Sequence, residues 1–159
     1  MLGVSCHDGG VAGMAVRKGA LHDLPILKAI FRRSSWSNEG DRALLTEHPE
    51  FLELTDTAVQ EGRTWIAEAE GRVVGFVTLR ETPSAAEVED LFVDPGFMRR
   101  GVGRVLIETI ASVAAERGWP QIEVDANPHA QEFYARTGFA ESGRVQLEHG
   151  IAMRMRRKT

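Results

Sequence analysis

Two stretches near the start of the chain have the apolar spacing of helices. Apolar residues within 24–31 recur at intervals of three and four, which predicts an amphipathic helix with Asp23 as its N-cap. The turn formers of 34–40 (SSWSNEG) predict the end of this helix. A second helical stretch is expected over 42–60, interrupted at Pro49.

The middle of the chain changes to the composition of β-strands. The runs 64–69 and 72–79 are rich in β-branched and aromatic residues, and Glu70-Gly71 between them predicts a tight antiparallel hairpin. Further strands are expected over 15–18, 87–93, 121–125, 139–145 and 151–155. In the last of these, methionines alternate with arginines, which indicates a strand with one solvated face rather than a nucleic-acid-binding segment.

Two helices separate the later strands. The apolar positions of 102–114 mark one helix face, which Gly118 closes. Asn127-Pro128 begins a shorter helix, which ends at Gly138. The order of elements therefore predicts an α/β fold, with a mixed central sheet of about six to seven strands flanked by about four helices.

Composition narrows the class of protein. With 159 residues, 43% of them hydrophobic, the chain suits one domain, which we expect over 14–159 after a flexible extension over 1–13. No apolar run approaches the ~18 residues of a membrane span, and no signal peptide pattern opens the chain. We therefore expect a cytoplasmic protein without a membrane partner. The net charge of −4 argues against nucleic acid as a partner.

Cysteine and histidine residues give no sign of a metal site. Cys6 is the only cysteine, which excludes an internal disulfide and a thiolate metal site. His22, His48, His129 and His149 lack the i, i+4 spacing of a ligand pair. We therefore expect no metal.

One segment suits phosphate binding. The sequence VDPGFMRRGVGR follows an expected strand and places Gly101 and Gly103 at the start of a helix. Glycines let a phosphate approach the backbone, the helix N-terminus adds positive potential, and Arg99, Arg100 and Arg104 add charge. On the glycines alone, two interpretations stay open: a phosphate site, or a tight turn into a packed helix.

The kind of phosphate ligand can be narrowed by exclusion. A dinucleotide fingerprint needs a third glycine at the position of Leu106, in the first strand–helix unit of a parallel sheet. A triphosphate-binding loop needs Gly-Lys followed by Ser or Thr, where this chain has Gly103-Arg104-Val105. Both ligand classes are therefore disfavoured.

Two longer motifs carry a family resemblance. The run VEDLFVDPGFMRRGVGRVLIETI, followed by EVDANPHAQEFYARTGF, resembles the GNAT superfamily of acetyl-coenzyme A-dependent N-acyltransferases, with matching strand order from about Ala15 to Met155. The family's loop pattern is Gln or Arg, two residues, Gly, one residue, then Gly or Ala. It maps onto 98–103, with Met98 in place of the polar residue. The resemblance implies the GNAT fold and acetyl-CoA as acyl donor.

The resemblance also implies coenzyme contacts. Val93 is expected to pair its backbone with the pantetheine arm like an added strand, and a backbone N–H near it to serve as the oxyanion donor. Asn127 either contacts the coenzyme arm or caps the helix ahead of Pro128; we expect capping, which is compatible with the contact. The expected coenzyme-binding residues are Leu91, Phe92, Val93, Met98, Arg99, Arg100, Gly101, Val102, Gly103, Arg104, Asn127, Phe133 and Tyr134.

Acetyl transfer to an amine needs a base for the amine and a proton donor for the departing thiolate. Tyr134 is the expected donor, because the resemblance points the tyrosine of this helix at the coenzyme sulfur; the alternative is a ring packed beside Phe133. Glu87 and Glu89 share one strand face, and by resemblance Glu87 holds the position of a family carboxylate. One of the two is the expected base, and the alternative is a solvated strand face.

Candidate acceptor contacts come from two parts of the chain. Glu123 and Asp125 alternate on one strand and either form an acidic pocket for a cationic amine or carry surface charge. By resemblance, the region between the first two helices borders the acceptor pocket, which makes Trp36, Asn38 and Glu39 candidates. For Trp36, however, we expect burial at a helix junction.

The resemblance therefore predicts direct transfer of an acetyl group, in a ternary complex, to a small cationic amine. A non-catalytic acyl-CoA-binding or interaction module stays open as the alternative, because related folds host different functions. The resemblance also allows a homodimer through the final strands.

Overall fold

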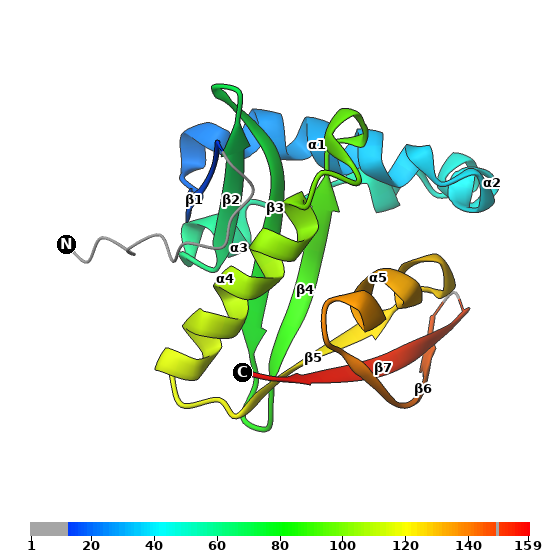
Figure 1. Ribbon diagram of the computed structural model, residues 1–159. Helices are drawn as coiled ribbons and strands as arrows, with labels where there is room; N and C mark the ends of the chain where they lie inside the picture. The colour runs from blue at the N-terminus through cyan, green and yellow to red at the C-terminus, as the bar shows by residue number, and fades with distance from the viewer. Residues whose placement is uncertain (1–12, 149) are drawn as a thin grey trace. The chain divides into compact units, whose positions relative to one another are not determined.

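Seven strands and five α-helices make up the part of the chain that this computed structural model describes, residues 13–148 and 150–159. The strands are β1 (Met14–Lys18), β2 (Thr64–Ala69), β3 (Arg72–Glu81), β4 (Ala86–Val93), β5 (Gln121–Ala126), β6 (Ala140–Leu147) and β7 (Gly150–Lys158). The α-helices, labelled with them in Figure 1, are α1 (Leu24–Ser37), α2 (Arg42–Glu47), α3 (Thr57–Gln60), α4 (Val102–Glu116) and α5 (Gln131–Arg136). The extension predicted over 1–13 lies, apart from Gly13, outside the described residues.

The strands form a mixed sheet in the order β1-β2-β3-β4-β5-β7-β6. The β4–β5 pair is parallel, and the β1–β2, β2–β3, β5–β7 and β6–β7 pairs are antiparallel. The predicted hairpin is confirmed: Ala69 pairs with Arg72, and Glu70 and Gly71 have φ of +53° and +74°, as a two-residue type I′ turn requires. The α/β fold expected from the sequence is therefore confirmed.

The chain divides into two compact units. The first comprises the chain up to Thr78 together with Asp90–Leu106. The second comprises Leu79–Glu89 together with Ile107–Thr159. Each unit carries part of the predicted functional residues, so each is described by itself.

The core of the first unit lies between helices and the hairpin strands. Its buried cluster comes from α1, α3, β2 and β3: Leu27, Ile30, Val59, Ile66 and Phe76. Leu27 and Ile30 belong to the predicted apolar face, so burial of that face stabilises α1. Phe92, near the end of β4, packs edge-on against Phe31 of α1, with ring centroids 4.7 Å apart. This contact packs the end of β4 against α1.

The second unit buries apolar side chains of α4, β5 and β7. Ile107, Ile110 and Ala114 recur on one face of α4 and are buried, as the predicted helical spacing requires. Ile122 of β5 and Met155 of β7 are also buried. The strands β5, β7 and β6 are joined by continuous hydrogen-bonded ladders and lie side by side in Figure 1. These ladders fix the backbone positions of the side chains that the strands carry.

The helical region near the start differs from the prediction. α1 runs through the turn formers to Ser37 instead of ending near residue 34, because Ser34 is buried and packing overrides local turn preference. The stretch 42–60, in contrast, is interrupted at Pro49 as predicted: it consists of α2, a 3₁₀ turn at Pro49–Leu52, and α3. Proline lacks the N–H that a continuous helix would need there.

Asp23 stands at the N-cap position of α1, as predicted, but its buried side chain makes no capping bond to the helix. The carboxylate instead turns back to accept the Ala20 N–H at 2.8 Å and two bonds from the Arg17 guanidinium at 2.8 and 2.9 Å. The bonds from Arg17 outweigh burial and lower the pKa of the Asp23 carboxyl to about 2. Since Arg17 also donates to Glu68 of β2, this group links β1, β2 and the start of α1.

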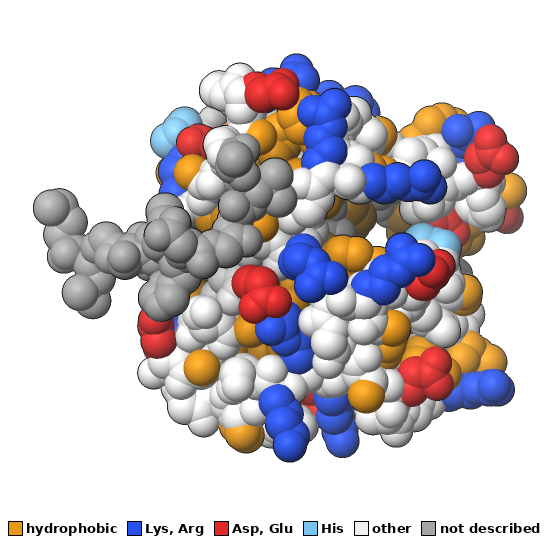
Figure 2. Space-filling view, in the orientation of Figure 1, with side chains coloured by type: hydrophobic (Ala, Val, Ile, Leu, Met, Phe, Trp, Pro, Cys, Tyr) orange, Lys and Arg blue, Asp and Glu red, His pale blue; other side chains and the backbone are white. Residues whose placement is uncertain are grey.

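The surface is mixed in character. On the face drawn in Figure 2, basic and acidic side chains are interspersed. Large apolar side chains such as Leu21 and Ile151 are exposed at separate places along the chain. No helix among residues 13–148 and 150–159 is long and apolar enough to cross a membrane.

Candidate functional site

In the first unit, β4 leads through a turn into α4. β4 ends at Val93, a 3₁₀ turn covers Pro95–Phe97, and α4 begins at Val102. Arg99 and Gly101 both have left-handed backbone, with φ of +63° and +83°, and for Arg99 this conformation is unfavourable. Because the first N–H groups of a helix have no acceptor within it, the turn presents backbone donors at the positive end of α4.

Hydrogen bonds of Asp94 hold the start of this turn in place. Its carboxylate accepts the Gly96 N–H at 3.1 Å and Arg33 Nη2 of α1 at 2.6 Å, and its N–H donates to the Val74 carbonyl of β3 at 2.8 Å. Partial burial alone would raise the pKa of the Asp94 carboxyl, but the bonds from Gly96 and Arg33 outweigh it and lower the pKa. The turn is therefore anchored to α1 and β3.

Phe97 anchors the middle of the turn. Its side chain is buried, and the guanidinium groups of Arg72 and Arg100 lie 4.6 and 5.0 Å from its ring centroid. Arg100 also lies 3.7 Å from the carboxylate of Glu70. Positive side chains are thereby held beside the backbone donors of the turn.

Gly75 of β3 makes close packing beneath the turn possible. A Cβ at this position would lie 3.0 Å from the Phe92 carbonyl oxygen and 3.0 Å from Cγ1 of Val102. Neither Gly75 nor the Arg33–Asp94 pair stands out in the sequence. Their roles depend on contacts between residues far apart in the chain, for which no local sequence signal exists.

The predicted coenzyme-binding residues of this unit lie in two runs, 91–93 at the end of β4 and 98–104 leading into the start of α4. Leu91, Phe92, Val93 and Gly101 are half-buried, Val102 and Gly103 are buried, and Met98, Arg99, Arg100 and Arg104 are exposed. Exposed cations, glycine backbone and a helix N-terminus therefore occur together, as an anion site requires.

In the second unit, the four predicted acidic residues line one hollow of about 200 Å³. Its lining residues are Arg80, Glu87, Val88, Glu89, Glu123, Val124, Asp125 and Arg154. The parallel ladder between β4 and β5 places Glu87 opposite Glu123, and Glu89 and Asp125 follow two residues later on the same strands. Both predicted acid pairs, Glu87 with Glu89 and Glu123 with Asp125, therefore line the same hollow.

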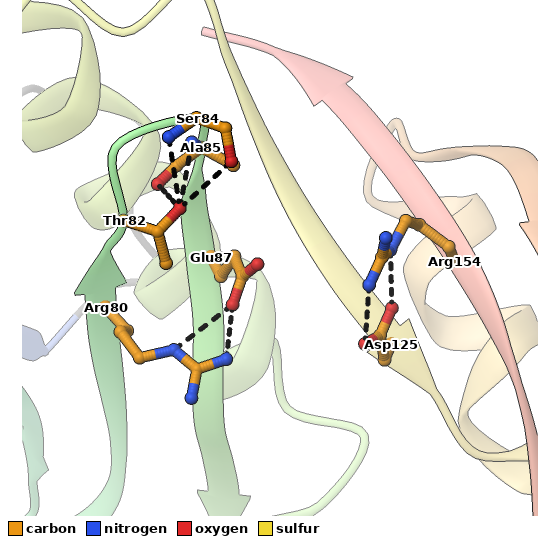
Figure 3. A network of polar contacts seen from close by, with 7 residues as sticks. All are labelled: Arg80, Thr82, Ser84, Ala85, Glu87, Asp125 and Arg154. Carbon is orange, nitrogen blue, oxygen red and sulfur yellow. Dashed lines mark hydrogen bonds and ion pairs between the residues drawn. The ribbon is translucent and has the colours of Figure 1, made fainter. Parts of the chain in front are cut away.

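Figure 3 shows two ion pairs of this hollow. Nε and Nη2 of Arg80, on β3, donate to Oε2 of Glu87 at 3.1 and 2.5 Å. Nε and Nη2 of Arg154, on β7, donate to the two carboxylate oxygens of Asp125 at 2.9 and 3.2 Å. Asp125, more than any other group, raises the pKa of Arg154, and Glu123 and Glu87 add to the effect.

A third arginine holds Glu123. This carboxylate, whose residue is 8% exposed, accepts a bond from Nε of Arg156 at 2.8 Å. The register of β5 on β7 places Glu123 opposite Arg156 and Asp125 opposite Arg154, so these are cross-strand pairs. The alternation of methionine and arginine near the C-terminus predicted the solvated face of β7, but it could not identify these partners.

Tyr134 lies on α5 of the second unit and is 7% exposed. Its ring packs against Phe133 and Phe139, with centroids 5.1 and 5.3 Å away and the rings edge-on. This packing fixes the ring. It agrees with the packing alternative from the sequence and leaves the catalytic hypothesis open.

Asn127 stands at the N-cap position ahead of Pro128, as predicted, but of a 3₁₀ turn rather than of α5. Asn127 precedes a 3₁₀ turn at Pro128–Ala130 and makes no side-chain capping bond. Its carbonyl instead accepts the Ala130 N–H at 2.9 Å. Because α5 begins only at Gln131, the exposed Asn127 side chain stands too early in the chain to cap it.

Comparison with known proteins places the chain in a family. A family model described as "Acetyltransferase (GNAT) domain" matches residues 41–159. The chain belongs to this family. The chain spans 38% to 64% of the lengths of the first four curated relatives it matches.

Two curated relatives of this GNAT chain have acceptors of different kinds in their names. A peptidyl-lysine N-acetyltransferase of Escherichia coli is 31% identical over 103 residues, covering 62% of this chain and 64% of the relative. An aminoglycoside N(6')-acetyltransferase of Salmonella typhimurium is 27% identical over 126 residues, covering 72% and 83%. The relatives therefore leave the acceptor undetermined.

A solved structure supports the fold of the GNAT chain. PaiA N-acetyltransferase from Thermoplasma acidophilum, in complex with coenzyme A, matches with a TM-score of 0.72 and 18% identity. The match covers 92% of this chain and 99% of that one. At this identity the likeness shows the fold.

The remaining candidates of the GNAT chain lie in the first unit, around the end of α1. Trp36, in the last turn of α1, is 43% exposed, so the expectation that it is buried is wrong. The carbonyl of Trp36 accepts a hydrogen bond from Nε of Arg42 at 3.0 Å. Asn38 follows the helix and Glu39 opens a 3₁₀ turn.

The described histidine and acidic residues do not form a metal cluster. Within residues 13–148 and 150–159, no three His, Cys, Asp or Glu side chains come together as a metal site needs. Three acids of the hollow, Glu87, Asp125 and Glu123, form ion pairs with arginines.

Proposed function

We propose that this GNAT protein transfers the acetyl group of acetyl-CoA directly to a small primary amine, in a ternary complex. The grouping of Glu87, Glu89, Glu123 and Asp125 around one hollow carries the proposal. A primary amine is a cation at neutral pH and must lose a proton before it can attack. Carboxylates serve both needs, since they attract the cation and one can accept the proton.

The turn that opens α4 suits the pyrophosphate of the coenzyme. Backbone N–H groups, the α4 dipole and the exposed Arg99, Arg100 and Arg104 all favour an anion there. Since most of these donors belong to the backbone, Met98 in place of a polar residue removes one side-chain contribution only. Acetyl-CoA bound in this way supplies the thioester that donates the acetyl group.

Three groups of the chain have roles in the transfer. Glu87 accepts a proton from the ammonium, directly or through water, which leaves a lone pair on nitrogen. The N–C bond then forms, and a backbone N–H near Val93 stabilises the negative charge on the acetyl oxygen. When the C–S bond breaks, its electron pair goes to sulfur, to which Tyr134 donates a proton; Tyr134 regains one from the new amide nitrogen.

The charge of the hollow supports a cationic amine as acceptor. Its lining holds four carboxylates and two guanidinium groups, which gives a formal charge of −2. Arg80 holds Oε2 of Glu87 by two bonds and so fixes the carboxylate in place. A small amine fits a hollow of about 200 Å³.

Calorimetric titration of the purified protein tests the coenzyme part of the proposal. We expect acetyl-CoA to bind with a Kd on the order of micromolar. ATP and NAD, run as comparators, should bind at least an order of magnitude more weakly. Absence of acetyl-CoA binding would contradict the proposal.

Tyr134→Phe tests the proton donor. The variant keeps the ring packing against Phe133 and Phe139 but loses the hydroxyl proton, so kcat should fall by about 100-fold. Its Kd for acetyl-CoA, measured by calorimetry, should stay close to that of the wild type. Unchanged kcat would remove Tyr134 from the mechanism.

A further inference from the structure

The hollow holds arginines as well as carboxylates. Arg80 and Arg154 line it, and Arg156 pairs with Glu123 beside it. Glu87, Asp125 and Glu123 each already hold one guanidinium group. A polycation would therefore compete with arginines fixed by neighbouring strands, which disfavours an acceptor with several amines and no anion.

Arg154 is held in place while it keeps donors for a ligand. The β5–β7 register sets it opposite Asp125, and the pair uses two of the five N–H donors of the guanidinium. Its side chain is 36% exposed. A planar guanidinium with further N–H groups suits a carboxylate or phosphate, which it can bind through two bonds.

Glu87 and Arg154 belong to the same hollow but to different ion pairs. Figure 3 shows the Arg80–Glu87 pair and the Asp125–Arg154 pair as separate groups, on β3 and β4 and on β5 and β7. The negative charge of Glu87 nevertheless acts on Arg154. It raises the pKa of Arg154, although less than Asp125 does. One ligand with two opposite charges could thus contact both.

We infer that the acceptor is a small amine that also carries a carboxylate or phosphate group. Its ammonium lies beside Glu87, and its anionic group binds Arg154. The inference rests on the proposed function, because it places the acceptor next to the proposed base. Such a ligand satisfies both signs of charge in the lining without separating an existing ion pair.

Matched pairs of amines test the inference through thiol release from acetyl-CoA by the full chain. β-Alanine is compared with propylamine, O-phosphoethanolamine with ethanolamine, and spermidine serves as the polycation. We expect kcat/KM to be at least about tenfold higher for the anionic member of one or both pairs, the usual effect of a charge-assisted bond. The pair that responds tells carboxylate from phosphate.

Equal kcat/KM within both pairs overturns the inference, and so does the absence of turnover with all four amines. A preference for spermidine over both anionic amines overturns it as well.

Arg154→Gln identifies the residue that binds the anion. In this variant the ratio of kcat/KM between the anionic and the neutral amine of the responding pair should fall to about one. The neutral amine loses no contact, so only the anionic amine is affected. Arg154→Lys should keep part of the discrimination because it keeps the charge. Arg117→Gln is the matched control: it removes an arginine paired with Glu81 at 3.1 Å outside the hollow, and should keep the wild-type ratio.

Retention of the full ratio by Arg154→Gln would contradict the assignment to Arg154. Thermal unfolding and acetyl-CoA titration of each variant establish that it is folded. These measurements also separate the two proposals. If the wild-type protein does not bind acetyl-CoA, the proposed function is refuted. If it acetylates amines but does not prefer those that carry an anionic group, this inference alone is refuted.

Discussion

The turn that opens α4 and the hollow around Glu87 are built in opposite ways. The turn uses consecutive residues, and its donors are backbone N–H groups held by Asp94 and Phe97. The hollow uses side-chain charges from four strands, held by ion pairs between them. A backbone site should tolerate side-chain changes such as Met98 and depend on glycine, whereas the hollow should respond to single charges.

The largest effect is expected from Gly101→Val. A β-branched side chain is strongly disfavoured at φ +83° and would obstruct approach of a phosphate to the backbone. We expect acetyl-CoA affinity to fall by about 100-fold or more, as measured by calorimetry. Gly118→Val is the matched control, because Gly118 has φ +86° with open space around its Cβ position. Equal loss of affinity in both variants would contradict a specific role for Gly101.

Glu87→Gln should give the next largest effect. The amide cannot accept the proton of the ammonium, so kcat/KM for the amine should fall by about 100-fold with acetyl-CoA affinity retained. Glu81→Gln, which changes an arginine-paired carboxylate outside the hollow, should keep wild-type kinetics. Thiol release as a function of amine concentration measures both. Similar kinetics for the two variants would remove Glu87 as base.

Arg33→Gln should have a smaller effect, confined to the coenzyme. It removes the bond from α1 to Asp94, which anchors the turn without belonging to it. We expect KM for acetyl-CoA to rise about three- to fivefold, the effect of one exposed charge-assisted bond, with kcat nearly unchanged. Arg32→Gln, at the neighbouring exposed position, should leave KM as in the wild type. An effect on kcat alone would argue against this anchoring role.

Asp23→Asn should leave catalysis unchanged and alter the pH dependence of stability. The folded-state pKa of Asp23 is lowered to about 2 from 3.8, so its stabilisation is present above pH 4 and lost as pH falls toward 2. The variant should lose about 1–2 kcal/mol of unfolding free energy at pH 7. Thermal unfolding from pH 7 to 2.5 should show a steeper acid decline in the wild type than in the variant. Exposed Asp56→Asn should decline as the wild type does; an equally steep decline in Asp23→Asn would contradict the account.

The strands and the glycine turn that opens α4 could be predicted from the sequence because their signals are local. Glu70-Gly71 predicts a two-residue hairpin, and Gly101 and Gly103 after a strand predict a glycine turn into a helix. Both signals depend on neighbouring residues alone. The acid pairs on β4 and β5 were also accessible, since alternation places Glu87 with Glu89 and Glu123 with Asp125 on one face each.

The ion-pair partners of the acidic residues could not be predicted from the sequence, because they depend on contacts between segments far apart in the chain. Arg154 meets Asp125 through the β5–β7 register, and Arg33 meets Asp94 although 61 residues separate them. The burial expected of Trp36 and the side-chain capping bonds expected of Asn127 and Asp23 failed for a related reason. Each expectation assigned a local role, a buried junction or a cap, where packing elsewhere set the end of α1 or the direction of a side chain.

Amine-dependent release of thiol from acetyl-CoA tests the central claim most directly. The wild-type protein is mixed with acetyl-CoA and the amine panel, to which a lysine-containing peptide is added. The account predicts saturable thiol release with at least one small amine, and about 100-fold less with Glu87→Gln. Tight binding of acetyl-CoA without thiol release by any amine would contradict it and would identify a non-catalytic acyl-CoA-binding module.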